Sequence, residues 1–213
     1  IYKKVRPLHG LHACQLFNRN IDEFERIGLF SPHRIPQLEE LNLYLKQATN
    51  WRVKPVNGIL SQREFLYCLA FRTFCSTQSI RHPSKPEYTP EPDIMHEFLG
   101  HIPNFANQEI CEISQLLGIL SLGASDEEIQ KLAAVYWFTI EFGICREKGH
   151  LKFYGAGLAG CVKEILYFAR MVREQPGMFL QLDVSKAVPL DLVTQDLQPF
   201  YYVAESFEDC IRQ

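Results

Sequence analysis

Residues 125–147 read S-D-E-E-I-Q-K-L-A-A-V-Y-W-F-T-I-E-F-G-I-C-R-E, which is the strongest helical pattern in the chain. Ser125 and Glu128 form a capping box, which predicts that a helix begins at Asp126 and runs to about Glu147. One face of this helix is apolar or aromatic, at positions 129, 132, 133, 136, 137, 140 and 144. A long helix with one face in the core favours a mainly helical fold.

The flanking sequence extends the helical prediction. Amphipathic or capped segments predict further helices over residues 37–49, 61–74, 93–101, 108–122 and 154–172. Pro103 is expected to stop the third of these helices. Four prolines between Gln78 and Pro92 exclude continuous helix and predict a long, irregular loop. Residues 184–203 offer only a small hairpin. We therefore predict a mainly α fold with little β-structure, in which residues 1–213 form one catalytic domain.

The amino-acid composition and charge exclude some classes of function. The 213 residues are 46% hydrophobic and 22% charged, which is typical of an ordinary globular domain. The net charge is −3 and the basic residues are dispersed along the chain, so the sequence shows no basic cluster that would bind nucleic acid or an anionic membrane. No basic-then-apolar stretch of the kind expected of a signal peptide opens the given sequence, and Thr139, Glu141 and Gly143 interrupt the most apolar stretch. These features favour small-molecule chemistry in the cytoplasm.

Seven cysteines occur without a C-x-x-C pair and mostly among apolar neighbours. They are expected to be reduced, buried thiols, as in a cytoplasmic protein. The chain begins with Ile1 instead of Met, as expected of a fragment or a trimmed chain.

The first chemical signal is P-E-P-D-I-M-H-E-F-L-G-H-I-P, residues 90–103. Zinc proteases carry H-E-x-x-H, but here Gly100 occupies the place of the second histidine, which follows as His101. Residues five apart lie about 140° from each other around an α-helix. His96 and His101 can therefore share one ion only if the helix bends or ends between them, and Gly100 and Pro103 would permit this.

The second signal is Glu141, which is flanked at helical spacing by Trp137, Phe138, Ile144 and Cys145 and therefore points inward. A buried carboxylate costs several kcal/mol unless a cation or metal pairs with it. Two histidines and one carboxylate form the facial triad of non-haem Fe(II) oxygenases, which leaves three coordination positions open. Iron is therefore favoured over zinc.

Each signal alone has an ordinary explanation. His96 and His101 would be hydrogen-bonded histidines, Glu141 would pair with Arg146, and the aromatic residues 136–138 would be core packing. Only their combination indicates a metal site. The other histidines have polar or unpatterned neighbours and are expected at the surface: His9, His12, His33, His82 and His150.

The chain also resembles a known family, the pterin-dependent aromatic amino acid hydroxylases. The resemblance runs from about Leu11 to Glu208 and includes, in the family's order, S-T-Q-S-I-R-H, Y-T-P-E-P-D, H-E-F-L-G-H-I-P, S-L-G-A-S-D-E-E-I, K-L-A-A-V-Y-W-F-T-I-E-F-G, Y-G-A-G-L and Y-Y-V-A-E-S-F. It implies a monooxygenase that uses Fe(II), tetrahydrobiopterin and O₂ to hydroxylate the ring of an aromatic amino acid.

The resemblance also implies a role for individual residues. His96, His101 and Glu141 match the family's iron ligands. The pterin would contact the backbone of Gly58, Ile59 and Leu60, stack on Phe65, and be lined by Glu97, Ala133 and Tyr136. Glu97 would then not be a zinc-type general base. The substrate carboxylate would bind the forked guanidinium of Arg81, which Asp93 would hold. The other implied substrate contacts are Thr89, Pro92, Trp137, Phe142 and the position of Gly160.

Trp137 and Y-Y-V-A-E-S resemble the phenylalanine branch, so phenylalanine to tyrosine is the favoured reaction, ahead of tryptophan 5-hydroxylation or tyrosine 3-hydroxylation. Ala159, Gly160 and Cys161 replace a usual Leu-Ser-Ser run and remove a hydroxyl that bonds an iron-ligand histidine in the family. Cys75 replaces a usual histidine near the pterin. Relaxed substrate choice or lower activity would follow.

Two functions of other classes stay open, a zinc hydrolase and an inactive amino acid binding protein. The chain shows neither the regulatory domain nor the tetramerisation helix of vertebrate members, so a monomer or dimer is expected.

Overall fold

The computed structural model describes residues 1–213 except 88, 90, 185–196 and 213, and only the backbone of 207, 208 and 211. The α-helices are α1 (Tyr2–His12), α2 (Gln15–Arg26), α3 (Leu38–Ala48), α4 (Gln62–Ala70), α5 (Ile102–Phe105), α6 (Gln108–Ser121), α7 (Asp126–Tyr136), α8 (Ala156–Ala159), α9 (Val162–Glu174) and α10 (Phe207–Arg212). The described residues also form two π-helical segments, η1 (His96–His101) and η2 (Trp137–Glu141), and a 3₁₀ turn, η3 (Pro176–Met178).

The strands form two small sheets. Strands β1 (Arg52–Val56) and β2 (Thr73–Thr77) pair in parallel, with Val53 opposite Phe74. The second sheet has the order β4-β3-β6-β5, from strands β3 (Ile144–Glu147), β4 (His150–Phe153), β5 (Phe179–Gln181) and β6 (Tyr201–Ala204). Among the strands of the described residues, only β3 and β4 pair antiparallel, because the tight turn at Lys148 and Gly149 joins them.

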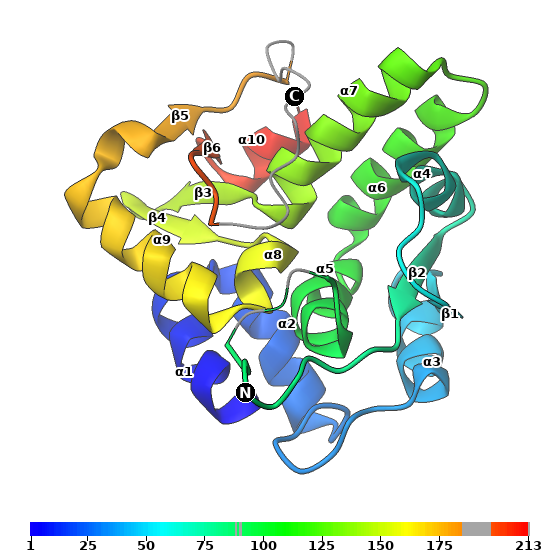
Figure 1. The fold of residues 1–213 in the computed structure, drawn as a ribbon, viewed down its shortest axis with the longest axis horizontal. Coiled ribbons are helices and arrows are strands. Elements are labelled where there is room, and N and C mark those ends of the chain that lie inside the picture. The colour runs from blue at the N-terminus through cyan, green and yellow to red at the C-terminus, as the bar shows by residue number, and fades with distance from the viewer. Residues whose placement is uncertain (88, 90, 185–196, 213) are drawn as a thin grey trace.

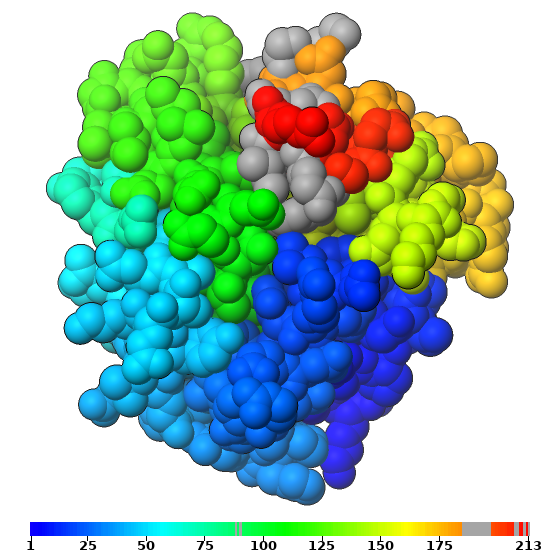
Figure 2. Space-filling view, turned by 180° about the vertical axis from the view of Figure 1, so that it is seen from behind, coloured from blue at the N-terminus to red at the C-terminus, as the bar shows by residue number. Residues whose placement is uncertain are grey.

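The elements enclose one hydrophobic core. In Figure 1 the N-terminal helices α1 to α3 lie at the bottom, and β6 and α10 lie at the top. From behind, the N-terminal segments fill the lower half of the visible face (Figure 2). Among the described residues, the buried apolar cluster extends from Val5 to Cys210 and includes the stacked rings of Trp51 and Phe105, whose centroids are 4.5 Å apart. Within this described part, no helix is long and apolar enough to cross a membrane.

Local sequence explains most of the helices. Ser61 and Ser125 each accept a hydrogen bond from the backbone of a glutamate three residues on, whose side chain bonds back, so both capping boxes are formed. The predicted helices over 37–49 and 108–122 are present within a residue or two as α3 and α6. The predicted loop between Gln78 and Pro92 contains no helix or strand among its described residues.

Two predicted helices end earlier than the sequence pattern suggests. The helix over 61–74 ends at Ala70, because the chain reverses through Arg72 at φ 51° and then enters β2. The helix from Asp126 was expected to reach Glu147, but it ends at Glu141, and residues from Ile144 form β3. Gly143 marks the break: a Cβ there would lie 1.9 Å from the carbonyl oxygen of Thr139.

Two other predicted helix boundaries were also wrong. Pro103 does not stop the helix, because α5 begins at Ile102 and the missing N–H of a proline costs little in a first turn. The helix expected over 154–172 is divided at Gly160 and Cys161 into α8 and α9. Of the hairpin expected over 184–203, residues 185–196 lie outside the described part, and β6 pairs in parallel with both neighbours.

Candidate functional site

The two histidines lie on a π-helical segment. In a π-helix the backbone bond joins residues five apart, and the N–H of Ile102 donates to the carbonyl of Glu97. Side chains five apart are therefore neighbours, which the α-helical angle of about 140° would not allow. The two Nε2 atoms lie 3.0 Å apart. The expected departure from a straight helix is present, and its form is a wider helical turn.

Glu141 comes from the second π-helical segment, η2, where the N–H of Phe142 donates to the carbonyl of Trp137. Its carboxylate reaches the same point as the histidines. One oxygen lies 2.9 Å from His101 Nε2 and the other lies 3.5 Å from His96 Nε2. Among the described residues, these three side chains form the one group of His, Cys, Asp or Glu whose ligand atoms all lie within 4.8 Å.

The three side chains fit a metal ion. Ligand atoms about 2.1 Å from an ion and at right angles to one another are separated by about 3.0 Å. The observed separations of 3.0, 2.9 and 3.5 Å match this facial arrangement. Two imidazole nitrogens and one carboxylate, all on one side of the ion, are the ligand set of non-haem iron.

Protonation of the group is set by burial and mutual charge. Burial lowers the pKa of His96 to about 4 against the pull of Glu141. Burial also opposes ionisation of Glu141, but the charges of His101 and His96 outweigh it and lower that pKa. Burial opposes protonation of His101, yet Glu141 raises its pKa by charge and hydrogen bonding. A neutral His96 and an ionised Glu141 are the forms that bind metals.

A largely apolar pocket opens beside this group. Every residue that the sequence predicted for the pterin lines it, and so do two of the predicted substrate contacts: Gly58, Ile59, Leu60, Phe65, Glu97, Ala133, Tyr136, Pro92 and Trp137. The rings of Phe65 and Tyr136 pack edge to face with centroids 5.1 Å apart. Gly58 adopts φ 91°, a conformation that favours glycine.

Glu97 lies in the wall of this pocket, almost fully buried at 3% exposure. Its Oε1 accepts hydrogen bonds from the backbone N–H and the hydroxyl of Thr77, at 3.0 and 2.9 Å. Burial raises its pKa to about 7, although His101 and Thr77 act in the opposite direction. Its carboxyl is held by β2 and is absent from the group of potential metal ligands.

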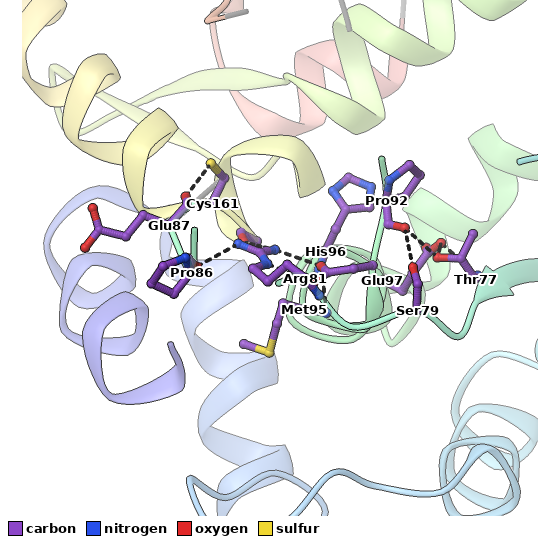
Figure 3. A network of polar contacts seen from close by, with 12 residues as sticks. Thr77, Ser79, Arg81, Pro86, Glu87, Pro92, Met95, His96, Glu97 and Cys161 are labelled. Carbon is purple, nitrogen blue, oxygen red and sulfur yellow. Dashed lines mark hydrogen bonds and ion pairs between the residues drawn. The ribbon is translucent and has the colours of Figure 1, made fainter. Parts of the chain in front are cut away.

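Arg81, which Figure 3 shows beside Pro86 and His96, forms a buried ion pair with Asp93. Neither residue lines the pocket. Arg81 Nε and Nη2 donate to the two carboxylate oxygens, each at 2.8 Å. Nη2 also donates to the carbonyl of Gly160 at 3.1 Å, and Nη1 donates to that of Pro86 at 3.4 Å. Asp93 therefore holds Arg81, as the resemblance implied, but four of the five guanidinium N–H groups are already used.

The remaining predicted contacts, Thr89, Phe142 and Gly160, do not line the pocket. Phe142 packs against Trp137 with ring centroids 4.8 Å apart, and Trp137 Nε1 donates to Gln198 at 3.1 Å. Thr89 is half-buried on the loop before Pro92 and does not line the pocket. Gly160 packs against the backbone of His96.

Sequence reasoning missed several features of this region. It assigned no role to Val56, Gln62, Leu66, Phe74 or Thr77, which also line the pocket. The T-F-C-S-T segment, with its β-branched and aromatic residues, is the signal that would have revealed β2. His9 was expected at the surface but is fully buried, and its Nε2 lies 2.8 Å from the carbonyl oxygen of Ala159. His33, His82 and His150 are exposed, as expected, and His12 is half-buried.

A facial His-His-Glu set beside an apolar pocket defines the class of non-haem iron proteins. Within that class, the chain belongs to the biopterin-dependent aromatic amino acid hydroxylase family, whose model matches residues 1–213. Iron and a biopterin are accordingly its cofactors, as predicted. Membership of this family favours an iron site over a zinc hydrolase site as the role of His96 and His101.

The chain is similar to curated members of two branches. It is 46% identical to human phenylalanine-4-hydroxylase over 209 residues, covering 98% of this chain and 45% of the relative. It is 44% identical to tyrosine 3-monooxygenase of Rattus norvegicus over 209 residues, covering 98% and 41%. The chain therefore spans less than half the length of these relatives.

Solved structures share the fold. Phenylalanine hydroxylase of Legionella pneumophila superposes with a TM-score of 0.89 at 28% identity, covering 100% of this chain and 88% of that one. The Chromobacterium violaceum enzyme with bound iron(III) and 7,8-dihydrobiopterin gives 0.87 at 26%, covering 99% and 75%. The predicted mainly helical hydroxylase catalytic fold is confirmed.

Proposed function

We propose that this chain is the catalytic part of a monooxygenase that uses O₂ to hydroxylate the ring of phenylalanine, giving tyrosine. The observation that carries the proposal is the convergence of His96, His101 and Glu141 in the pocket wall, in a member of this family. The slightly higher identity to phenylalanine-4-hydroxylases supports phenylalanine over tyrosine as substrate.

His96, His101 and Glu141 would hold the iron. Because all three approach from one side, the opposite side stays open toward the pocket. The bound iron and biopterin together supply the electrons and the site for activating O₂. The chain itself would contribute positioning and exclusion of water, since the pocket wall is largely apolar.

The pterin would lie between the backbone of residues 58–60 and the Phe65 ring. Glu97, Ala133 and Tyr136 line the same space, so that one ligand can contact all of them. Glu97 would accept a hydrogen bond from the pterin while Thr77 keeps its carboxyl in place.

The aromatic ring of the substrate would lie against Pro92 and Trp137, with Phe142 behind Trp137. Arg81 would bind the substrate carboxylate. Since one N–H of Nη1 has no acceptor among the described residues, the carboxylate would accept one bond there, and a second if the long contact to the Pro86 carbonyl gives way. Thr89, on the loop just before Pro92, would add a polar contact.

One assay distinguishes among the three candidate substrates and also tests whether the protein is inactive. The chain is incubated with Fe(II), tetrahydrobiopterin and O₂ against phenylalanine, tyrosine and tryptophan in parallel, and the products are identified. Tyrosine formed fastest from phenylalanine supports the proposal. Faster conversion of tyrosine to its 3-hydroxy product would assign the chain to the other branch, and amino acid binding without any product would indicate an inactive binding protein.

A further inference from the structure

Trp137 lies in the pocket wall, at the start of the π-helical segment that ends at Glu141. Its backbone is fixed, because its carbonyl accepts the N–H of Phe142 and closes the π-helical turn. Its indole ring is only half-buried, and a side chain with such access to solvent can change rotamer unless a contact prevents it. The orientation of the indole therefore depends on the side chains that touch it.

Gln198 supplies a hydrogen-bond acceptor for this ring. Trp137 Nε1 donates to Gln198 Oε1 at 3.1 Å, while the ring of Phe142 packs against the indole with centroids 4.8 Å apart. An indole N–H that is withdrawn from water usually finds an acceptor, since leaving it unpaired is costly. The two contacts together oppose rotation of the indole.

Gln198 is itself held firmly. It is buried at 4% exposure and precedes Pro199, which favours extended backbone at Gln198. Its backbone N–H donates to Glu164 Oε1 at 3.3 Å. The hydroxyl of Tyr201, the first residue of β6, donates to the same oxygen at 2.5 Å. One carboxylate oxygen thus fixes the short segment between Gln198 and Tyr201.

The support for this segment is separate from the metal and pterin contacts. Glu164 lies in the first turn of α9 and is buried at 4% exposure. Strand β6 pairs with β3 on one side and β5 on the other. Neither α9 nor β6 contains a residue proposed to bind the metal or the pterin. A change at Gln198 should therefore act on the indole and leave those two contacts in place.

We propose that Gln198 is a positioning residue, which fixes the Trp137 indole in the pocket wall through its side-chain oxygen and so sets how large an aromatic ring the pocket accepts. The inference rests on the proposed function, which places the ring of the substrate against Trp137. Gln198 does not line the pocket, so its influence on a substrate passes through Trp137. An indole without this bond can turn, and the pocket then discriminates less between rings of different size.

The first test measures selectivity, defined as kcat/KM for phenylalanine divided by kcat/KM for tryptophan, with Fe(II), tetrahydrobiopterin and O₂. Gln198→Met removes the side-chain oxygen and nearly preserves the length of the side chain. Gln130→Met is the matched control, since Gln130 is an exposed glutamine of α7. Both substitutions are repeated in Trp137→Phe, which has no indole N–H. This cycle separates an effect through Trp137 from a general structural effect.

We expect Gln198→Met to lower the selectivity by about threefold to tenfold, as the loss of one hydrogen bond would. In the Trp137→Phe background the same substitution should change the selectivity by less than about twofold, because the bond is already absent. Gln130→Met should match its parent in both backgrounds. Unchanged selectivity in Gln198→Met, or an equal loss in both backgrounds, would overturn the proposal.

The second test does not depend on turnover. The chain has two tryptophans, and Trp51 Nε1 has no hydrogen-bond partner among the described residues. In NMR spectra of the full chain loaded with Zn(II), which is diamagnetic, Trp137→Phe identifies the Trp137 indole signal. Gln198→Met should move the Trp137 indole proton upfield and leave that of Trp51 in place.

A Trp137 signal that stays at its wild-type position in Gln198→Met would also overturn the proposal. If the wild type hydroxylates neither amino acid, the proposed function fails instead, and with it the link to substrate selectivity. The indole signal then still decides whether Gln198 holds Trp137. The two failures are therefore distinguishable.

Discussion

Gly160 lies closer to His96 than any side chain would allow. A Cβ at this position would lie 2.6 Å from His96 Cα and 3.2 Å from the carbonyl oxygen of Met95. The carbonyl of Gly160 accepts a hydrogen bond from Arg81. Gly160 thus contacts both His96, a proposed metal ligand, and Arg81, the proposed partner of the substrate carboxylate. It lacks the hydroxyl that the family's usual serine carries.

Gly160→Ala is expected to lower the free energy of unfolding by about 1–3 kcal/mol, the usual effect of overpacking, and to weaken Co(II) binding because His96 must shift. Denaturant unfolding and Co(II) titration measure the two effects. Gly10→Ala is the control, since a Cβ there meets nothing within 4 Å. Gly160→Ser should behave like the alanine variant, and tighter Co(II) binding in the serine variant would contradict this explanation.

Arg81→Lys keeps the charge but loses the planar fork. If Arg81 binds the substrate carboxylate, the wild type should bind phenylalanine about tenfold or more tightly than phenylalaninamide, and the variant should lose most of that preference. Dissociation constants of the two ligands provide the measurement. Arg63→Lys, in an exposed pair with Asp126, is the control. An unchanged preference in Arg81→Lys would remove Arg81 from the carboxylate site.

At the level of elements, all three proposed ligands lie on π-helical segments. Asp93 stabilises the approach to the first of these segments, because its Oδ1 accepts from the backbone N–H groups of Met95 and His96, both at 3.1 Å. The same carboxylate pairs with Arg81 in a buried position. The start of the metal-binding segment and the position of Arg81 therefore depend on one side chain.

Asp93→Asn should cost about 3–5 kcal/mol of folding free energy, because it leaves the buried guanidinium without its counter-charge. Metal affinity should fall as well, since the amide accepts the backbone N–H groups less strongly than a carboxylate does. Asp126→Asn, which breaks an exposed pair, should cost about 1 kcal/mol or less. Equal stability of the two variants in urea titrations would argue against this role of Asp93.

The sequence predicted elements well where local signals decide the structure. The capping box at Ser125 and the amphipathic pattern of α3 are sufficient to locate the helix starts. The π-helical turns escaped prediction because periodicity is counted at three and four residues, while the histidines are related by five. Strand β3 was missed because its apolar residues continue the helical pattern, and Gly143, the signal for the break, was treated as part of the helix.

The three metal ligands of the candidate site could be predicted from the sequence. Ionisable side chains are costly to bury without a partner, and these three stand among apolar residues. The use of four of the five Arg81 N–H groups could not be predicted, because Gly160, whose carbonyl accepts one of these hydrogen bonds, lies 79 residues further along the chain. Burial of His9 depends in the same way on its partner Ala159, 150 residues further along the chain.

For the whole molecule, the packing of α1 against the rest of the core makes stability depend on pH. His9 packs edge to face against the rings of Phe17 and Phe153, and its Nδ1 has no hydrogen-bond partner among the described residues. Burial lowers the pKa of His9 to about 4, whereas an unfolded histidine titrates near 6.5. Between these values the unfolded chain binds more protons, so acidification favours unfolding.

The free energy of unfolding is therefore expected to fall by up to about 3 kcal/mol through His9 as the pH drops from about 6.5 to 4. His9→Phe should be less stable near neutrality, because the Ala159 carbonyl loses its donor, but should show a smaller loss on acidification. Urea titrations at several pH values measure both. A pH dependence identical to that of the wild type would show that His9 is not the group responsible.

Three side chains from two π-helical segments are proposed to hold a single iron. Anaerobic equilibrium titration with Fe(II) measures this binding, on the wild type and Glu141→Ala, with Glu127→Ala as an exposed control. One iron per chain should bind to the wild type and the control, and Glu141→Ala should bind at least about 100-fold more weakly. Undiminished iron affinity in Glu141→Ala would contradict the assignment.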